Sequence, residues 1–319
     1  PYLRPGGAVE GWWNPDLQAS DDDGEITATY ADRDRYAAAW DADDPAAYDW
    51  DADQTQRWWI EALKDKITTW EAFSNSPPYF LTDSGFVSGG INDANAEQLA
   101  PEDMDAFAGY LVNVVEHLDQ TYGIDFDSLD PFNEPNTNYW GTNIPSGQTW
   151  PTSASRQEGA HIGPERQDQM IKALAERLAM SSTTTDVPIS AMDETNPSRF
   201  VTNWNGWSLE SKDLVSQLNV HTYGTSDRVM VRDIAKASDK PLWMSEVEGD
   251  WDTSGQGFNQ TNIDNGIGMA TRMIDDLREL EPTAWVFWQP VEDLYNMEKV
   301  EKLNWGSVFI DFDCNADGD

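Results

Sequence analysis

Several features that mark common classes of protein are scarce in this chain of 319 residues. Its only cysteine is Cys314, so no disulfide bond can form within the chain. No run of about 18 consecutive apolar residues occurs, and we therefore expect no membrane span. Lysine and arginine number 20 against 58 aspartates and glutamates, which gives a formal net charge of −38. Because binding to phosphates requires clustered basic side chains, we also expect no nucleic-acid partner.

Residues that hold metals and nucleotides are equally sparse. Neither His117 nor His161 lies in a His-Glu-x-x-His pattern, which argues against a catalytic zinc ion. Residues 313–319 match the first half of a calcium-binding loop, but an acidic turn in an acidic protein explains them better. The glycine-rich fingerprint of nucleotide-binding folds is absent. The sequence therefore predicts no metal and no cofactor.

The excess of acidic residues is the extreme feature of the composition. High negative charge with little lysine indicates either intrinsic disorder or adaptation to high salt. The chain has 16 tryptophans and is 39% hydrophobic, which argues against disorder. At molar salt the Debye length falls to about 3 Å, so the repulsion among the acidic side chains is largely screened. We predict that the protein is halophilic.

Apolar residues at helical spacing alternate along the chain with short apolar runs. The helical spacing predicts helices at residues 54–66, 102–122, 164–180, 228–237 and 263–280. The short runs predict strands at residues 69–73, 128–133, 187–192, 214–221, 241–247 and 283–288. Residues 1–54 show no clean strand, and we expect an irregular, acidic, aromatic-rich segment that packs on a catalytic domain formed by residues 55–319.

This alternation predicts an α/β fold with a parallel sheet buried on both faces. Polar and aromatic residues gather where the predicted strands end, as they do on the active face of a (β/α)8 barrel. A doubly wound sheet would also place ligands at strand ends. The missing nucleotide fingerprint favours the TIM-type barrel. With about six strands predicted, a closed barrel needs one or two more, upstream or within residues 1–54.

Two glutamates at strand ends are the candidate catalytic residues. Glu134 lies in Asn133-Glu134-Pro135, where the proline biases it toward an extended conformation; a surface glutamate in a turn is the plain alternative. Glu246 ends a later strand in Met244-Ser245-Glu246. Two carboxyls about 5–5.5 Å apart carry out retaining glycoside hydrolysis, one as the acid and one as the nucleophile.

Further side chains near the strand ends are candidates for holding the nucleophile or the sugar. His221 and Tyr223, one strand before Glu246, could donate hydrogen bonds that keep a carboxylate charged. Glu248 competes with Glu246, but it lies beyond the apolar strand. Polar and aromatic side chains at other strand ends and in the adjoining loops are candidate sugar ligands, the tryptophans by stacking: Asn75, Asp193, Trp140 and Trp251.

Four motifs in order resemble glycoside hydrolase family 30, a family of retaining (β/α)8 hydrolases. They are Ser-Asn-Ser-Pro-Pro at 74–78, Pro-Phe-Asn-Glu-Pro at 131–135, Gln-Glu-Gly at 157–159 and Trp-Met-Ser-Glu at 243–246. The first and third are most similar to the endo-β-1,6-galactanase-like branch. The resemblance implies Glu134 as acid/base and Glu246 as nucleophile. It also implies Asn133 as a ligand of the sugar 2-hydroxyl and Trp288 as a stacking platform.

The resemblance covers roughly residues 1–310. The family also has barrel strands before the point that matches Pro1, and a β-sandwich side domain built from both chain ends. We therefore expect this chain to form an incomplete barrel that lacks the first strands and the side domain. Any signal peptide would lie outside the chain.

The sequence thus predicts a secreted, monomeric, retaining endo-β-glycosidase that acts on a β-linked polysaccharide, β-1,6-galactan first. The alternatives within the family are a β-1,6-glucanase, a xylanase and a glucosylceramidase-like enzyme. A non-catalytic carbohydrate-binding protein is the rival from another class, although it would not need both glutamates. An acidic, ion-buffering surface protein would explain the charge but not the motifs.

Overall fold

The computed structural model describes residues 40–148, 151, 157–181, 184, 186–248, 263–293 and 308–310. Trp251 and the acidic residues 313–319 lie outside these described residues. The chain divides into two compact units. The first unit contains Pro1–Glu194 and Thr202–Gln217, and the second contains Thr195–Val201 and Leu218–Asp319.

The first unit is built on three parallel strands in the order β1-β3-β5. These strands are β1 (Glu71–Phe73), β3 (Ser128–Asp130) and β5 (Ile189–Glu194). Leu129 lies opposite Ala72 on one side and Ile189 on the other. All residues of β3 and β5 are buried, as expected for parallel strands that are covered on both faces.

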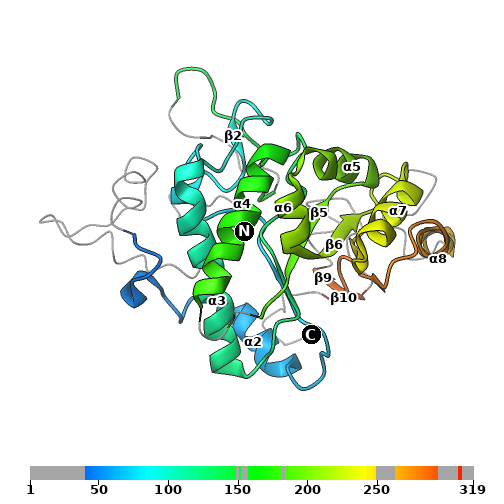
Figure 1. The fold of residues 1–319 in the computed structure, drawn as a ribbon, viewed down its shortest axis with the longest axis horizontal. Coiled ribbons are helices and arrows are strands. Elements are labelled where there is room, and N and C mark those ends of the chain that lie inside the picture. The colour runs from blue at the N-terminus through cyan, green and yellow to red at the C-terminus, as the bar shows by residue number, and fades with distance from the viewer. Residues whose placement is uncertain are drawn as a thin grey trace, which may run out of the picture. The chain divides into compact units, whose positions relative to one another are not determined.

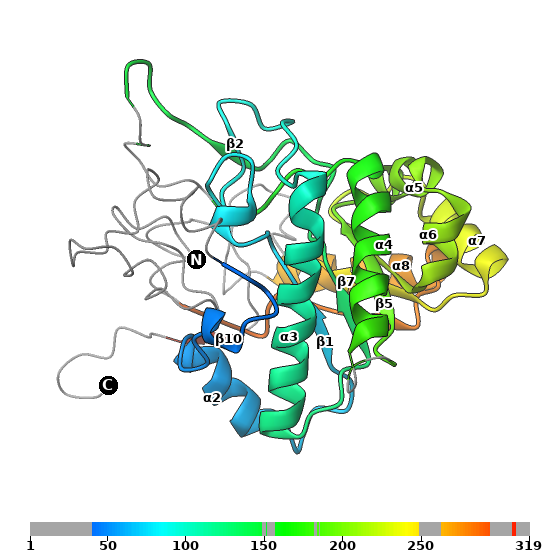
Figure 2. The same cartoon turned by 60° about the vertical axis from the view of Figure 1, so that its left-hand side comes forward.

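Helices of this unit precede, separate and follow the strands along the chain. They are α2 (Gln54–Leu63), α3 (Met104–Tyr122), α4 (Pro164–Met180) and α6 (Leu209–Leu214), while α5 (Pro197–Gly206) crosses the boundary between the units. Helices α3 and α4 run side by side (Figures 1 and 2). Their apolar stripes are buried as predicted, with Phe107 and Val115 from α3 and Met170 and Leu174 from α4 nearly inaccessible to solvent.

Shorter elements complete the described part of the first unit. Three are 3-10 helices: η3 (Pro45–Ala47), η4 (Tyr79–Leu81) and η5 (Pro101–Asp103). Two short strands, β2 (Gly90–Ile91) and β4 (Gly141–Thr142), pair in parallel. Helix α3 stops at Gly123, whose φ of +65° is open to glycine without strain and whose N–H bonds to the carbonyl of Asp119.

The second unit repeats the same alternation. Strands β6 (Val215–His221), β7 (Leu242–Glu246) and β8 (Ala284–Trp285) are parallel and pair in the order β6-β7-β8. Helix α7 (Arg228–Ser238) follows β6, and helix α8 (Ile263–Glu279) follows β7. A separate parallel pair is formed by β9 (Val291–Asp293) and β10 (Val308–Ile310).

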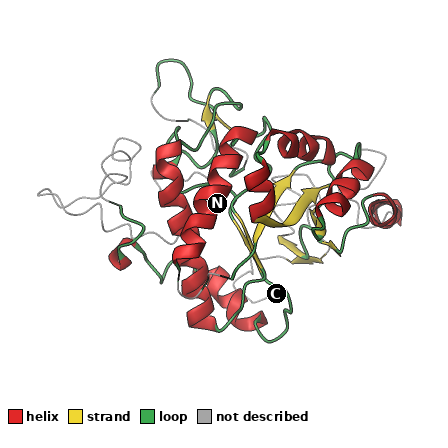
Figure 3. Cartoon of the chain, in the orientation of Figure 1, coloured by secondary structure: helices red, strands yellow, loops and turns green. Residues whose placement is uncertain are grey.

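The parallel strands follow one another in chain order, and a helix follows each of β1, β3, β5, β6 and β7. This arrangement confirms the predicted α/β fold, an incomplete (β/α)8 barrel (Figure 3). Five of the six predicted strands run longer than those observed, while β5 keeps its predicted length but begins and ends two residues later. For example, β3 ends at Asp130 because Pro131 has no N–H to donate to a neighbouring strand. Helices α5 and α6 were not predicted, since their short segments lack a long apolar stripe. Among the described residues, no helix is both long and apolar enough to cross a membrane.

Candidate active site

The Asn-Glu-Pro motif lies in the loop that follows the carboxyl end of β3, within the first unit. The side chain of Asp130 accepts a hydrogen bond from the N–H of Phe132 at 3.0 Å, which turns the chain directly after the strand. Asn133 and Glu134 are each 6% exposed. Oδ1 of Asn133 is buried and has no hydrogen-bond partner among the described residues. An acceptor left unpaired in this way is suited to a hydroxyl group of a ligand.

The backbone of Glu134 is fixed by its neighbours. Its φ is +44°, a left-handed conformation that is uncommon for a residue other than glycine. Its N–H donates to the carbonyl of Asp193 at 2.8 Å. Asp193, at the end of β5, is 4% exposed and also has a positive φ, of +47°. The structure thus brings together three of the predicted site residues: Asn133, Glu134 and Asp193.

A buried network that the sequence patterns did not predict lies beside this loop. Oε2 of Glu194, a side chain with no solvent exposure, accepts hydrogen bonds from the N–H of Asn136 at 3.0 Å and from Nδ2 of Asn203 at 2.6 Å. Nδ2 of Asn136 in turn donates to Oδ1 of Asn203 at 2.6 Å. Only the position of Glu194 beside Asp193 hinted at this role, since Asn203 belongs to an unpredicted helix.

The Ser-Asn-Ser-Pro-Pro motif after β1 contacts the Gln-Glu-Gly motif. Oγ of Ser76 donates to Oε1 of Glu158 at 2.7 Å. Burial raises the pKa of Glu158, and hydrogen bonds from Ser76 and Asn75 oppose that rise. The predicted sugar ligand Asn75 is half-buried and lies beside this third carboxyl group. The two motifs are 82 residues apart in sequence, so their contact could not be deduced from spacing.

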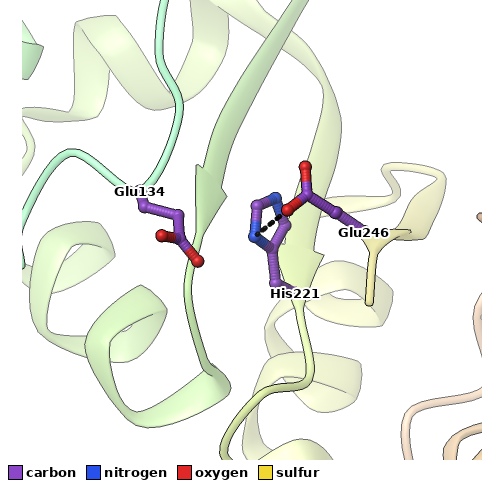
Figure 4. Close-up of side chains that lie close together, drawn as sticks. All are labelled: Glu134, His221 and Glu246. Atoms are coloured by element: carbon purple, nitrogen blue, oxygen red, sulfur yellow. Dashed lines mark ion pairs between the residues drawn. The ribbon is translucent and has the colours of Figure 1, made fainter. Parts of the chain in front are cut away.

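In the second unit, the predicted nucleophile meets both of its predicted partners. The hydroxyl of Tyr223 donates to Oε1 of Glu246 at 2.9 Å, and Nδ1 of His221 lies 3.9 Å from the same oxygen (Figure 4). The register between β6 and β7 shifts so that Val220 faces Met244 while His221 faces Glu246. Bulges of this kind re-aim side chains. Here the extra residue, Ser245, places Glu246 opposite His221.

The buried side chain of Asp276 binds Thr222, the residue between His221 and Tyr223. Asp276, on α8, has no solvent exposure and accepts a hydrogen bond from Oγ1 of Thr222 at 2.9 Å. It also accepts bonds from Nη1 of Arg228 at 2.7 Å and from Nε1 of Trp285 at 3.1 Å. A buried carboxylate needs such partners, and the arginine supplies the opposite charge. The end of β6 is therefore anchored through Thr222.

The predicted aromatic platforms have different surroundings. Trp140 was expected to stack on a sugar, but its side chain is only 2% exposed, so it offers no open face and that prediction is wrong. Trp288 is half-buried just after β8, and its N–H donates to the carbonyl of Val247 at 3.0 Å. Trp251 falls outside the described residues. Among the three candidate tryptophans, only Trp288 is both described and partly exposed, and we keep it as a proposed stacking platform for the sugar.

Comparison with known proteins gives one consistent result. The profile of O-glycosyl hydrolase family 30 matches residues 16–300. An exo-β-1,6-galactobiohydrolase of Bifidobacterium longum subsp. longum is 38% identical over 360 aligned residues, which cover 100% of this chain and 23% of that protein. An endo-β-1,6-galactanase of Hypocrea rufa is 28% identical and matches 79% of this chain and 48% of its own length. The chain spans less than half the length of both relatives.

A solved structure shares the fold. The crystal structure of a conserved exported protein from Bacteroides fragilis superposes with a TM-score of 0.61 at 20% sequence identity. The similarity covers 78% of this chain and 54% of that one. At this identity the likeness concerns the fold alone.

Proposed function

The chain belongs to glycoside hydrolase family 30, and from this we propose that the whole protein is a retaining endo-β-glycosidase that hydrolyses β-1,6-galactan. The observation that carries the proposal is the placement of two glutamates at the carboxyl ends of parallel strands. Glu134 follows β3, and Glu246 is the last residue of β7. In a (β/α)8 barrel, the carboxyl ends of all strands face one mouth, where catalytic residues lie.

The proposed reaction proceeds by double displacement. The carboxylate of Glu246 attacks the anomeric carbon while Glu134 gives its proton to the glycosidic oxygen, and the bond to the leaving sugar breaks. Glu134, now ionised, takes a proton from water, which attacks the anomeric carbon and releases Glu246. Each carbohydrate product then keeps the β-configuration. Retention by this route requires the two carboxyl groups to lie about 5–5.5 Å apart.

The surroundings of each glutamate support its role. The hydrogen bond from Tyr223 to Glu246 favours the ionised form that a nucleophile needs. The buried Oδ1 of Asn133, which has no hydrogen-bond partner in the described part of the chain, can accept a hydrogen bond from a sugar hydroxyl. Asn75, Asp193, His221 and Trp288 are proposed as further contacts to the sugar, and Trp251 remains a candidate outside the described residues. A non-catalytic sugar-binding protein would have no need of both glutamates.

Two relatives favour a β-1,6-linked galactan over the glucan and xylan alternatives. Their printed activities are an exo-β-1,6-galactobiohydrolase and an endo-β-1,6-galactanase. The identity to the first is higher, 38% against 28%, so an exo-acting enzyme that releases galactobiose is the second candidate. Since polysaccharides do not cross membranes, either activity fits a secreted protein. The net charge of −38 fits work in high salt.

Product analysis tests this proposal. The full-length protein is incubated with β-1,6-galactan, and the anomers first formed are followed by NMR. We expect β-anomers and a range of oligosaccharide sizes; galactobiose alone would support the exo-acting candidate. First formation of α-anomers would overturn the double-displacement mechanism, and an inert wild-type protein would support the binding-protein alternative.

Two variants test the assignments. Glu246→Gln should lose essentially all release of reducing sugar, and equal release by wild type and variant would refute the nucleophile. Glu134→Ala should recover activity when azide is added and yield a β-glycosyl azide, because azide needs no general base. Failure of azide to rescue the variant on a substrate with a good leaving group would refute the acid/base role.

A further inference from the structure

The left-handed backbone at Glu134 needs external support. A residue with a side chain adopts a φ of +44° only where surrounding contacts outweigh the local cost. The N–H of Glu134 is held by the carbonyl of Asp193. Its carbonyl oxygen accepts hydrogen bonds from two side chains. These contacts fix the backbone position from which the side chain of Glu134 extends.

Trp140 is one of those two side chains. Its indole Nε1 donates to the carbonyl of Glu134 at 3.0 Å, and Oγ1 of Thr137 donates to the same oxygen at 3.1 Å. The tryptophan is 2% exposed, so this bond is shielded from water. The indole N–H is the only hydrogen-bonding group of a tryptophan side chain and acts only as a donor. When it is buried, it is usually paired. The position of the ring therefore fixes the position of the Glu134 carbonyl.

Gly159 of the Gln-Glu-Gly motif fixes the ring in turn. A Cβ at this position would lie 2.2 Å from Cδ2 of Trp140, far closer than two carbon atoms can approach. Only glycine leaves the face of the ring free to lie there. The N–H of Gly159 bonds to the carbonyl of Val87 at 2.8 Å, which prevents the glycine from moving aside.

The residues after Gly159 brace the same loop. Nδ1 of His161 lies 2.9 Å from the carbonyl oxygen of Thr137, and the N–H of Ile162 donates to the carbonyl of Pro135 at 2.8 Å. All of these contacts lie within the first unit of the chain. Residues 159–162 thus contact both the ring of Trp140 and the loop at 134–137.

We propose that Trp140 is a positioning residue for the acid/base Glu134, and that Gly159 serves to seat its ring. This proposal rests on the proposed function, because it assumes that Glu134 donates the proton. Trp140 acts through the backbone of Glu134 and does not touch the sugar. On this proposal the Gln-Glu-Gly motif acts indirectly on proton donation, through Trp140, although it lies in a different loop from Glu134.

The test uses the dependence of the rate on the leaving group. A sugar leaving group needs a proton from Glu134, whereas 2,4-dinitrophenolate leaves without one. In the full-length protein, we expect Trp140→Phe to lower kcat/KM on β-1,6-galactan by roughly 10- to 100-fold, because a small misplacement of a catalytic group has that effect. On 2,4-dinitrophenyl β-1,6-galactobioside, kcat/KM should change by less than about 3-fold, because general acid catalysis is not required there.

Trp207→Phe is the matched control. Trp207 is also buried, at 4% exposure, and its indole N–H also makes a side-chain bond, to Oε1 of Gln167 at 3.1 Å. This control should keep the wild-type ratio between the two substrates. Gly159→Ala should reproduce the selective loss of Trp140→Phe, because its methyl group displaces the ring.

The results for Trp140→Phe and its control decide whether Trp140 positions Glu134. A selective loss on galactan in Trp140→Phe, absent from Trp207→Phe, supports the proposal. Equal losses on both substrates, or no loss, overturn it. If Glu134→Ala itself shows no selective loss on galactan, the acid/base assignment fails instead, so the two failures can be told apart.

Discussion

The phenol oxygen of Tyr223 lies 2.9 Å from Oε1 of Glu246. These residues come from the loop after β6 and from the last position of β7. The ring of Tyr223 also packs edge-on against His221, with ring centroids 5.8 Å apart. The tyrosine is therefore held in place while its hydroxyl holds the carboxylate.

Tyr223→Phe removes this hydrogen bond and little else. Because a bond to a charged group contributes about 1.5–3 kcal/mol, we expect kcat/KM on 2,4-dinitrophenyl β-1,6-galactobioside to fall roughly 10-fold or more. That substrate isolates the attack by Glu246. Tyr139→Phe is the control, since Tyr139 is 59% exposed. An unchanged rate in Tyr223→Phe would show that the bond does not assist the nucleophile.

Asn203→Ala should destabilise the protein. Asn203 donates to the buried Glu194 at 2.6 Å and accepts from Asn136 at 2.6 Å, so the truncation removes two buried hydrogen bonds. We expect the free energy of unfolding to fall by about 2 kcal/mol, measured by urea denaturation. Asn205→Ala, at an exposed position of the same helix, should change it by less than about 0.5 kcal/mol. Equal effects of the two substitutions would contradict the network's role.

Glu158 gives the stability a recognisable pH dependence. Burial raises its pKa, so the folded state favours the protonated carboxyl group. Its contribution to stability is full below the usual glutamate pKa of about 4.3 and is lost as the pH rises through the raised value. The melting temperature of Glu158→Gln, relative to wild type, should therefore increase between about pH 4 and pH 7. A constant difference over that range would contradict the raised pKa.

Asp168 should give the folding stability the opposite dependence on pH. Burial tends to raise its pKa, but hydrogen bonds from Ser211, Ser208 and Lys172 outweigh burial and lower the pKa to about 2. The resulting stability is present above the usual aspartate pKa of about 3.9 and is lost as the pH falls through about 2. Asp168→Asn should cost about 1 kcal/mol at pH 7 and much less near pH 2, as measured by thermal unfolding. An equal cost at both pH values would refute this origin.

Salt should stabilise the folded state. The formal net charge of −38 opposes compaction, and molar salt shortens the Debye length to about 3 Å. We expect the melting temperature and the initial rate on galactan to increase as KCl rises from about 0.1 M to molar concentrations. Circular dichroism and reducing-sugar assays measure the two quantities. A falling melting temperature would contradict the predicted halophilic character.

Much of the fold could be predicted because periodic apolar residues record which face of an element is buried. The stripe that includes Phe107 and Val115 predicted α3, and the helix at α4 was predicted with both of its ends correct. Helix α5 was missed because Asn203, which is fully buried, is polar and breaks such a stripe. Its burial depends on Glu194 and Asn136, which belong to other parts of the chain.

The candidate site, too, could be predicted from the sequence only in part. The order of motifs in the sequence determined the family, and strand-end positions singled out Glu134 and Glu246 as carboxylates. Only the tertiary structure decided that Trp140 is buried beneath Gly159, that Glu158 meets Ser76, and that Ser245 turns Glu246 to face His221. A sequence pattern reports how one segment meets solvent or core. Contacts between residues tens of positions apart depend on how several segments pack, and no single segment contains that information.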